Sequence, residues 1–314
     1  MAPSRIADRW IVAGLAGLCA ASAAAWLAPV GWPFELFSHF RLQLAATAAL
    51  LAPALWWLQR RRAAALAAGL AIVHFALAAP GLWITAPAPS CGGTPLVVVT
   101  ANVEYSNHDR RRFLRWLAAQ PADIVVLQEV TSAWATALSA LPGYPHRRIL
   151  AREDPYGIAV LSRWPFEAVE PVDLADDASP SVEGIVRVRG QSISLLALHT
   201  RWPITPKLWR SRDRSLLRAA AHARERALPT IAAGDLNLSP DSPAFARLLE
   251  EASFADTLAG RGWQPTWMAG FWPLALRIDH VLVSPALCVE HAEVGPDVGS
   301  DHRPLVVRLG LRAR

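Results

Sequence analysis

The sequence contains few cysteine residues, and this limits the classes of protein it can represent. Three cysteines occur in 314 residues, with no CxxC pair and no paired Cys/His spacing, so the pattern of a disulfide framework or a zinc site is missing. Cys19 lies in an apolar stretch. Cys91 and Cys288 could pair in an oxidising compartment, but two isolated thiols are more often unpaired, so the sequence leaves this pair open.

The chain also has few charged residues in its first 90 residues and no excess of basic over acidic residues to speak of beyond them. Six of its 31 basic and two of its 26 acidic residues lie in residues 1–90, which leaves 25 basic and 24 acidic residues in the remainder. This nearly neutral remainder does not have the broad basic surface that binding along duplex DNA favours. In addition, no period of about 20–50 residues repeats, which excludes a solenoid or a propeller.

The first 90 residues do contain three uncharged stretches, each about as long as the hydrocarbon core of a bilayer requires. These are residues 10–30, 42–58 and 63–86, and tryptophans lie towards their ends, where amphipathic rings prefer the headgroup layer. Three such stretches with few polar residues between them favour membrane-spanning helices over the buried helices of a soluble protein. We therefore predict a membrane anchor of about three transmembrane helices over residues 1–90 and a separate domain over residues 91–314.

Basic residues set the predicted orientation of this anchor. Arg5 and Arg9 precede the first stretch and Arg60, Arg61 and Arg62 lie between the second and third, so both sites are expected on the cytoplasmic side. Three crossings then make the chain a multi-pass protein of the cell (inner) membrane with its large domain periplasmic or extracellular. A rival interpretation takes residues 1–25 as a cleaved signal peptide, and it leaves the large domain on the same side.

The large domain is predicted to be α/β. Beyond a linker rich in Pro and Gly, short runs of Val, Ile and Leu alternate with a few helical patterns. The candidate strands are residues 96–101, 123–130, 157–162, 184–189, 192–199, 229–233, 277–284 and 305–309. The candidate helices are residues 109–119, 132–141, 206–227 and 242–250.

Several of these strands end in a polar residue suited to metal or phosphate chemistry. Asn102 and Glu129 follow two apolar runs, His199 and Asp235 follow two more, and Asp279 stands near the start of another. Each alone has an ordinary explanation, such as a solvated strand end or an Asx turn. Because strand ends of one sheet region lie side by side, the set together indicates one functional site.

The ordered motifs resemble the endonuclease/exonuclease/phosphatase superfamily. They are Asn102, Gln128-Glu129, His199, Gly234-Asp235-Leu236-Asn237, Arg277-Ile278-Asp279-His280 and Ser300-Asp301-His302-Arg303-Pro304, and residues 156–163 (YGIAVLSR) are similar to the family's central strand. The resemblance covers residues 96–309. It implies two β-sheets packed as a sandwich and flanked by helices. His199 departs from the apurinic-endonuclease branch, which has Tyr there, and brings the chain nearer to the deoxyribonuclease-, sphingomyelinase- and inositol-phosphatase-like branches.

The resemblance further implies a metal site and thus a metal-dependent phosphoester hydrolase. Glu129 is the expected principal ligand, with Asn102 and Asp301 nearby, and Mg²⁺ is the expected ion because it takes oxygen ligands, with Mn²⁺ as an alternative. Glu104, two residues after Asn102, is a weaker candidate for a second metal position.

The catalytic residues implied by the resemblance are His199, Asp235, Asn237, Asp279 and His302. In this reading Asp279 orients His302, which activates water, since a base effective near neutral pH is most easily built from His. His199 donates to a phosphate oxygen, and Asp154 is its candidate partner.

The main prediction for function is metal-dependent hydrolysis of a phosphodiester or phosphomonoester on the outer face of a membrane. Arg201 and Trp202 follow His199 and Trp272 precedes Asp279; such a rim suits anionic headgroups at the lipid bilayer, and hence a lipid-linked substrate. One alternative is a membrane-anchored nuclease, in which the bases of the nucleic-acid substrate would stack on the same aromatic residues. The other is a catalytically silent binding module. The sequence indicates no protein partner.

Overall fold

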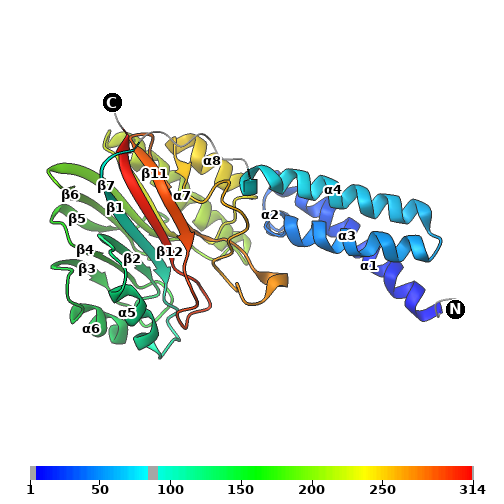
Figure 1. Ribbon diagram of the computed structural model, residues 1–314, viewed down its shortest axis with the longest axis horizontal. Helices are drawn as coiled ribbons and strands as arrows, with labels where there is room; N and C mark the ends of the chain where they lie inside the picture. Colours follow the sequence, from blue (N-terminus) through cyan, green and yellow to red (C-terminus); the bar gives the residue numbers. More distant parts are fainter. Residues whose placement is uncertain (1–4, 84–90, 313–314) are drawn as a thin grey trace. The chain divides into compact units, whose positions relative to one another are not determined.

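The computed structural model describes residues 5–83 and 91–312, which form two compact units (Figure 1). The first unit is helical and lies in residues 5–83, together with residues Pro240–Pro243. The second contains every strand among the described residues. Residues 84–86, where the sequence predicts the end of the third apolar helix, lie outside the described residues.

The helical unit consists of three long helices and two short ones. Leucines and small residues such as Leu18, Ala48, Leu55 and Ala67 pack between the long helices, and small residues allow helices to approach closely. Apolar side chains also lie on the outside, and Leu50 is 73% exposed; the predicted membrane anchor requires such an exposed apolar surface. The helices are α1 (Arg5–Trp26), the 3-10 turn η1 (Ala28–Val30), α2 (Glu35–Ser38), α3 (Arg41–Trp57) and α4 (Arg61–Trp83).

Two of the long helices meet the length and composition that a membrane-crossing helix needs. They are Arg9–Trp26 within α1 and Arg61–Trp83 in α4. Helix α3 has 17 residues and contains Pro53; at 1.5 Å per residue it spans about 26 Å, somewhat less than the roughly 30 Å of a hydrocarbon core. The sequence predicted three spans, whereas two helices of the structure qualify by length and composition, and membrane crossing itself stays a prediction.

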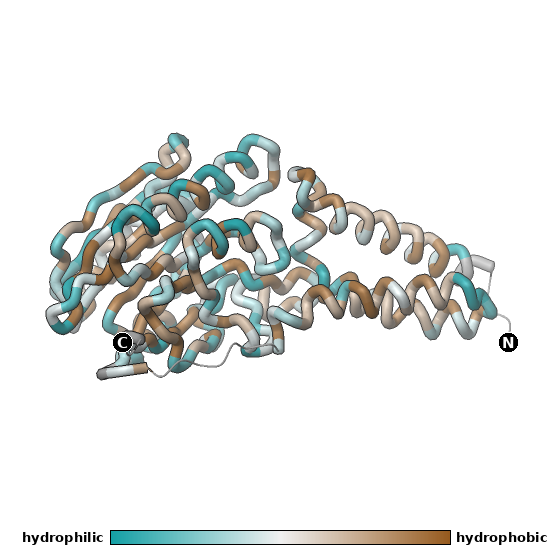
Figure 2. The backbone as a smooth tube through the Cα atoms, turned by 90° about the horizontal axis from the view of Figure 1, so that it is seen from above, coloured by the Kyte–Doolittle hydropathy of each residue, from teal (hydrophilic) through white to brown (hydrophobic). Residues whose placement is uncertain are grey.

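The start of α1 and the turn between α3 and α4 lie at the same end of the helical unit (Figure 1). Figure 2 shows this end as hydrophilic, while the helices between the ends are mostly hydrophobic. Arg9 belongs to the first of these segments and Arg60, Arg61 and Arg62 to the second. The basic residues on which the predicted orientation depends are therefore gathered at one end of the unit.

The second unit is built on two six-stranded sheets. The first has the order β11-β12-β1-β2-β4-β3 and the second the order β5-β6-β7-β8-β10-β9. The strands of the first are β1 (Cys91–Asn102), β2 (Ile124–Gln128), β3 (His146–Leu150), β4 (Ile158–Ser162), β11 (Leu287–Val294) and β12 (Leu305–Arg312). Those of the second are β5 (Phe166–Val172), β6 (Ser181–Val188), β7 (Gln191–His199), β8 (Thr230–Asp235), β9 (Ala255–Asp256) and β10 (Asp279–Val283).

The sheets pack face to face and helices cover their outer faces, so the predicted sandwich is confirmed. Val98 and Val126 point into the layer between the sheets, whereas their neighbours Val99 and Val125 pack outwards under helices. Burial on both faces explains why these strands read as continuous apolar runs. Helices α5 (Arg110–Ala118) and α6 (Ser132–Ser139) cover the first sheet, and α7 (Pro206–Glu225) and α8 (Pro243–Ala252) cover the second.

A disulfide joins Cys91 at the start of β1 to Cys288 in β11, a pair that the sequence left open. The two Cα atoms are 5.9 Å apart and 197 residues separate the cysteines in the chain. Gly310 in β12, between the two strands, provides the space: a Cβ there would lie 2.7 Å from the Cys91 Cβ and 3.3 Å from the Cys288 Sγ. A disulfide is expected to persist in an oxidising compartment rather than in the cytosol.

Candidate active site

Five strand ends, drawn from both sheets, bring polar side chains to one edge of the sandwich. Parallel pairing of β1 with β2 and of β7 with β8 sends their carboxyl ends to the same edge. Asn102 and Asp235 end β1 and β8, Glu129 directly follows β2, and His199 ends β7 opposite Asp235. Strand β10 runs antiparallel to β8, so its first residue, Asp279, also lies opposite Asp235.

The Asn102 side chain links the two sheets at this edge. Its Nδ2 donates to Glu129 Oε1 at 2.8 Å and to Asp235 Oδ2 at 3.1 Å, while its Oδ1 accepts from the Glu104 backbone N–H at 3.0 Å. The other Glu129 oxygen, Oε2, accepts from the Tyr105 backbone N–H at 2.9 Å. Asn102 therefore fixes the carboxylates of Glu129 and Asp235 relative to each other.

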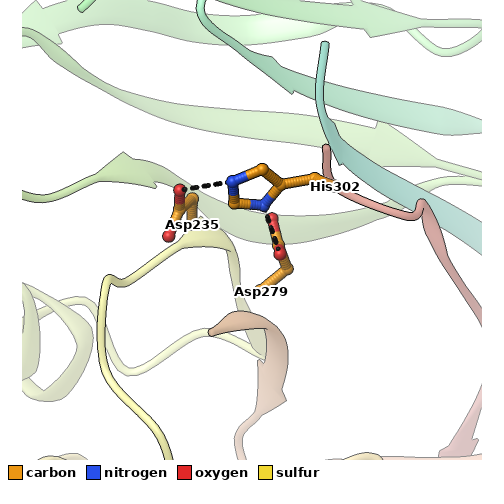
Figure 3. A group of neighbouring side chains, drawn as sticks. All are labelled: Asp235, Asp279 and His302. Atoms are coloured by element: carbon orange, nitrogen blue, oxygen red, sulfur yellow. Dashed lines mark hydrogen bonds and ion pairs between the residues drawn. The ribbon is translucent and has the colours of Figure 1, made fainter. Parts of the chain in front are cut away.

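His302 lies between two buried carboxylates (Figure 3). Its Nδ1 is 2.8 Å from Asp279 Oδ2, and its Nε2 is 3.8 Å from Asp235 Oδ2. Burial opposes a charged ring, but the charge and hydrogen bond of Asp279, followed by the charge of Asp235, raise the pKa of His302 to about 10. Burial and the Asp279 charge raise the pKa of Asp235 to about 7. This is the arrangement of an oriented acid–base histidine.

Oxygen ligands suited to a divalent cation lie at the same edge. Burial raises the pKa of Glu129, and repulsion by the Asp301 carboxylate adds to the increase. A cation between these carboxylates would offset the free-energy cost of keeping both of them charged. Their oxygens are the ligands that Mg²⁺ and Mn²⁺ prefer. Asp235, Asp279 and His302 also have ligand atoms within 4.8 Å of one another, but the Asp279–His302 hydrogen bond already commits two of the three to each other.

The loop that carries Asp301 and His302 is tied to the Glu104 segment. Glu104 Oε2 accepts from the Asp301 backbone N–H at 3.1 Å, and the Ser300 hydroxyl donates to the Asn102 backbone oxygen at 2.9 Å. In the structure Glu104 thus holds the loop that presents Asp301. Its role as a ligand of a second metal remains a prediction.

Unusual backbone conformations occur at the residues that form the site. Glu104, Glu129 and Asn237 have positive φ angles of 59°, 63° and 46°, and such conformations outside glycine cluster at functional sites. The Asn237 N–H donates to Asp235 Oδ1 at 2.8 Å, and its Nδ2 donates to the Thr200 backbone oxygen at 3.0 Å. Asn237 is therefore fixed beside Asp235, where the sequence placed it.

The segment of the chain that contains these residues matches a known protein family. The model of the Endonuclease/Exonuclease/phosphatase family matches residues 99–302, from β1 to His302. The chain belongs to this family. No curated protein matches the chain significantly.

Solved structures of the endonuclease/exonuclease/phosphatase fold resemble this chain at low sequence identity. A family protein from Beutenbergia cavernae is 24% identical over 70% of this chain and 72% of its own, with a TM-score of 0.56. Sphingomyelinase C from Streptomyces griseocarneus is 19% identical over 69% and 99%, with a TM-score of 0.52. The 3′ phosphatase NExo from Neisseria, solved with a product DNA hairpin, is 23% identical over 68% and 98%, with a TM-score of 0.56. At these identities the likeness shows the fold.

His199 is buried and lies on the other side of Asp235, with Nε2 3.7 Å from Asp235 Oδ2. Burial, followed by the charge of His302, lowers its pKa to about 3, so the ring is neutral at pH 7 and offers an N–H hydrogen bond rather than a proton. The predicted partner Asp154 is engaged elsewhere: its carboxylate accepts two hydrogen bonds from Arg152 and one from the Tyr156 N–H. The sequence prediction of an Asp154–His199 pair was therefore wrong, because a strong local pairing with Arg152 competes.

The three predicted rim residues differ in exposure. Trp202 and Trp272 are 55% and 43% exposed, as a surface for a substrate or a membrane requires. Arg201 is instead mostly buried, since its guanidinium binds Asp177 and stacks on Tyr156. Its contacts with substrate remain a prediction, whereas its contacts within the protein are established.

Sequence reasoning missed two contacts of the family's site residues. Trp267 donates from Nε1 to Asp301 Oδ2 at 2.9 Å, and its backbone pairs with His302, so a single Trp orients the Asp301 carboxylate. The Tyr156 ring packs on His199 with centroids 5.5 Å apart. Tyr156 stood in a recognisable motif, but only the fold shows which face of that motif meets His199.

His280, beside Asp279, is structural: its Nε2 hydrogen-bonds the Leu238 backbone oxygen at 2.7 Å.

Proposed function

We propose that this protein hydrolyses a phosphoester with the help of a divalent metal ion, in a domain held at the outer face of a membrane. The observation that carries the proposal is one edge of the sandwich where an oriented histidine, His302 with Asp279, stands next to the carboxylates of Glu129 and Asp301. A phosphoester resists attack by water because it is anionic, so its hydrolysis needs positive charge and a base.

Glu129 and Asp301 would hold Mg²⁺ or Mn²⁺, which when bound supplies positive charge to the phosphoryl oxygens and disfavours the protonated form of His302. Asn102 orients the Glu129 carboxylate, since its amide nitrogen already binds Glu129. Trp267 does the same for Asp301.

The chain's own groups then divide the reaction between them. His302 accepts a proton from the attacking water at Nε2, because Asp279 holds Nδ1. The water oxygen forms a bond to phosphorus, and the bond from phosphorus to the leaving oxygen breaks. His199, neutral and buried, donates a hydrogen bond to the oxygen that gains negative charge. Asp235 and Asn237 position the water and the phosphoryl group.

The location at the outer face is supported by the helical unit and the disulfide. The start of α1 and the turn between α3 and α4, the segments that contain Arg9 and residues 60–62, lie at one end of that unit, which favours the cytoplasm for this end. Three crossings would place the catalytic unit outside, whereas two would return it to the cytoplasm; the Cys91–Cys288 disulfide favours three. Only seven residues separate the end of α4 from the start of β1, and a connection of that length reaches at most about 25 Å, which supports a catalytic unit tethered near the bilayer.

A reporter enzyme that is active only outside the cytoplasm tests this topology. We expect activity when the reporter is fused after Arg314 and none when it is fused after Arg62. The reverse pattern would contradict the outward orientation and would leave the proposed chemistry untouched.

For the substrate, we favour a lipid-linked or membrane-proximal phosphoester. Trp202 and Trp272 expose aromatic surface, and aromatic rings with a polar edge suit a membrane interface. Together with the short tether to the helical unit, this supports a substrate within reach of the headgroups.

A nuclease is the second candidate, favoured by helix α5. Arg110, Arg111 and Arg112 form its first turn, with no acidic residue there, although the positive end of a helix dipole disfavours cations. Such a turn would gain stability from the phosphates of a nucleic acid.

An activity screen of the full-length protein in detergent separates the two candidates. The substrates are an anionic phospholipid, a sugar phosphate, single-stranded DNA and duplex DNA, each with and without Mg²⁺. Hydrolysis of the phospholipid that falls in Trp202→Ala and Trp272→Ala, but not in the matched surface variant Leu217→Ala (Leu217 is 40% exposed), supports the lipid substrate. DNA cleavage with no phospholipid hydrolysis would favour the nuclease. A protein that hydrolyses none of the four substrates, with or without Mg²⁺, would refute the proposed function.

A further inference from the structure

Arg201, two residues after His199, is held inside the catalytic unit rather than presented to solvent. Its side chain is 17% exposed. The guanidinium Nε donates to Asp177 Oδ2 at 2.8 Å, and Nη2 donates to the Asp177 backbone oxygen at 2.7 Å. The guanidinium carbon lies 3.8 Å from the centre of the Tyr156 ring, within the range of a cation–π contact.

The Asp177 loop that anchors Arg201 is itself fixed. The Asp177 carboxylate accepts hydrogen bonds from the hydroxyls of Ser179 and of Ser211 in α7. The Asp173 carboxylate accepts three backbone N–H groups of the same loop, from Ala175, Asp177 and Ala178. An arginine bound by two hydrogen bonds to so constrained a loop keeps one orientation.

Tyr156 connects this anchor to His199. The Tyr156 ring contacts the Arg201 guanidinium. It also packs on the His199 ring, with the ring centroids 5.5 Å apart and 34° between the ring planes. His199 Nε2 is 3.7 Å from Asp235 Oδ2, which exceeds hydrogen-bond distance. His302 is oriented by a carboxylate at 2.8 Å. His199 is supported instead by the Pro155 backbone and by packing on the ring of Tyr156, the next residue in the chain.

We propose that Arg201 is a positioning residue: by fixing Tyr156 it holds His199 in the orientation that donates to the leaving oxygen. This inference rests on the proposed function and deepens it, because it assigns Arg201 to leaving-group stabilisation instead of to a substrate rim. Misalignment of a hydrogen-bond donor by a small distance weakens stabilisation of the charge that develops on that oxygen. The effect is therefore largest for leaving groups that most need the stabilisation.

Two model diesters with different leaving groups test the assignment in the full-length protein. Ethyl p-nitrophenyl phosphate releases a stable anion and ethyl phenyl phosphate a less stable one. In Arg201→Met we expect kcat to fall about 10- to 100-fold for the phenyl ester and only a few-fold for the p-nitrophenyl ester, a loss within the range of one positioned group. Arg201→Lys keeps the charge beside Asp177 and should recover part of the loss. The ratio of the two rates in one preparation does not depend on the fraction of folded protein.

Arg218→Met is the matched control, because Arg218 binds Asp176 of the same loop at 2.7 Å from an exposed position. It should leave the ratio at the wild-type value. An equal loss for both esters in Arg201→Met, or the same ratio change in Arg218→Met, would overturn the positioning role. If Arg201→Met does not fold, an unchanged ratio in Arg201→Lys overturns it. Failure of the wild-type protein to hydrolyse either ester would instead contradict the proposed function.

Discussion

Replacing Asp279 by Asn isolates the contribution of the acid–base pair, because the change removes one charge and keeps the side-chain shape. Asp279 Oδ2 is 2.8 Å from His302 Nδ1, and the Asp279 side chain is fully buried. Asp279 makes the largest favourable contribution to the raised pKa of His302, which rises from 6.5 to about 10. Burial opposes this rise, so the attraction of Asp279, Asp235 and Asp301 for the protonated ring outweighs the cost of burying its charge.

Without this charge, the pKa of His302 falls and the imidazolium that forms during attack by water is less stable. We expect Asp279→Asn to lower kcat by about 10²- to 10⁴-fold, the usual contribution of a positioned base, with little change in the affinity for Mg²⁺. The sign of the pH effect follows from the same charge: a base with a lower pKa becomes deprotonated at lower pH, so the rising limb of the kcat–pH profile moves to lower pH.

Steady-state kinetics over a range of pH, together with Mg²⁺ titration, measure both effects. Asp123→Asn is the control, because Asp123 is a buried aspartate at the opposite end of β2 that accepts from the Val97 N–H and the Trp164 Nε1. A loss of kcat no greater than that of the control, or a rising limb that stays in place, would refute the assignment of His302 and Asp279.

Three further changes test the stability of the catalytic unit. Reduction of the disulfide, or Cys91→Ser with Cys288→Ser, should lower the free energy of unfolding by up to about 5 kcal/mol for a closed loop of 197 residues, as measured by denaturant titration; an unchanged value would show that the bond adds no stability. Gly234→Ala should lower the free energy of unfolding by about 3 kcal/mol or more, because a Cβ at this φ of +146° would lie 1.8 Å from a β7 carbonyl oxygen. Gly143→Ala, where the Cβ meets open space, should lower it by about 1 kcal/mol. Equal losses of stability in the two variants would contradict this explanation. Partial burial raises the pKa of Asp177, but hydrogen bonds from Arg201, Ser179 and Ser211 outweigh this effect and lower the pKa from 3.8 to about 2. After allowance for solvent screening, the contribution of this carboxylate to stability is about 1 kcal/mol; it is complete above about pH 4 and disappears as the pH falls through about 2, so the wild type and Asp177→Asn should converge in stability at low pH.

The two-sheet architecture was accessible from the sequence because the central strands are buried on both faces. Strands β2 and β4 each begin with four consecutive apolar residues and end in a polar one, Gln128 and Ser162, and such runs bounded by polar residues are a strong local signal. The four edge strands, β3, β5, β9 and β11, were missed. Strand β3 carries Arg147 and Arg148, and β5 contains Pro171, and both residue types are tolerated at an edge where one side is solvated.

The members of the site could be predicted for a related reason, whereas their partners could not. Asn102, Glu129 and His199 each stand at the end of an apolar run, so their convergence follows from strand order. Asp177 and Trp267 act on the site from loops, and nothing in the sequence nearby indicates that Asp177 meets Arg201 or that Trp267 meets Asp301. Such pairings depend on how distant segments pack, which no local pattern contains.

The central claim is that Glu129 holds the metal ion on which phosphoester hydrolysis depends. Hydrolysis of bis(p-nitrophenyl) phosphate by the purified full-length protein, measured while Mg²⁺ is removed and restored, tests this claim most directly when wild type and Glu129→Gln are compared. The account predicts that wild-type activity disappears on chelation and returns with Mg²⁺, and that Glu129→Gln needs a Mg²⁺ concentration higher by about tenfold or more to reach half of its maximum, since losing one charged ligand weakens a hard cation's site. Activity that persists under chelation, or an identical Mg²⁺ dependence in Glu129→Gln, would contradict it.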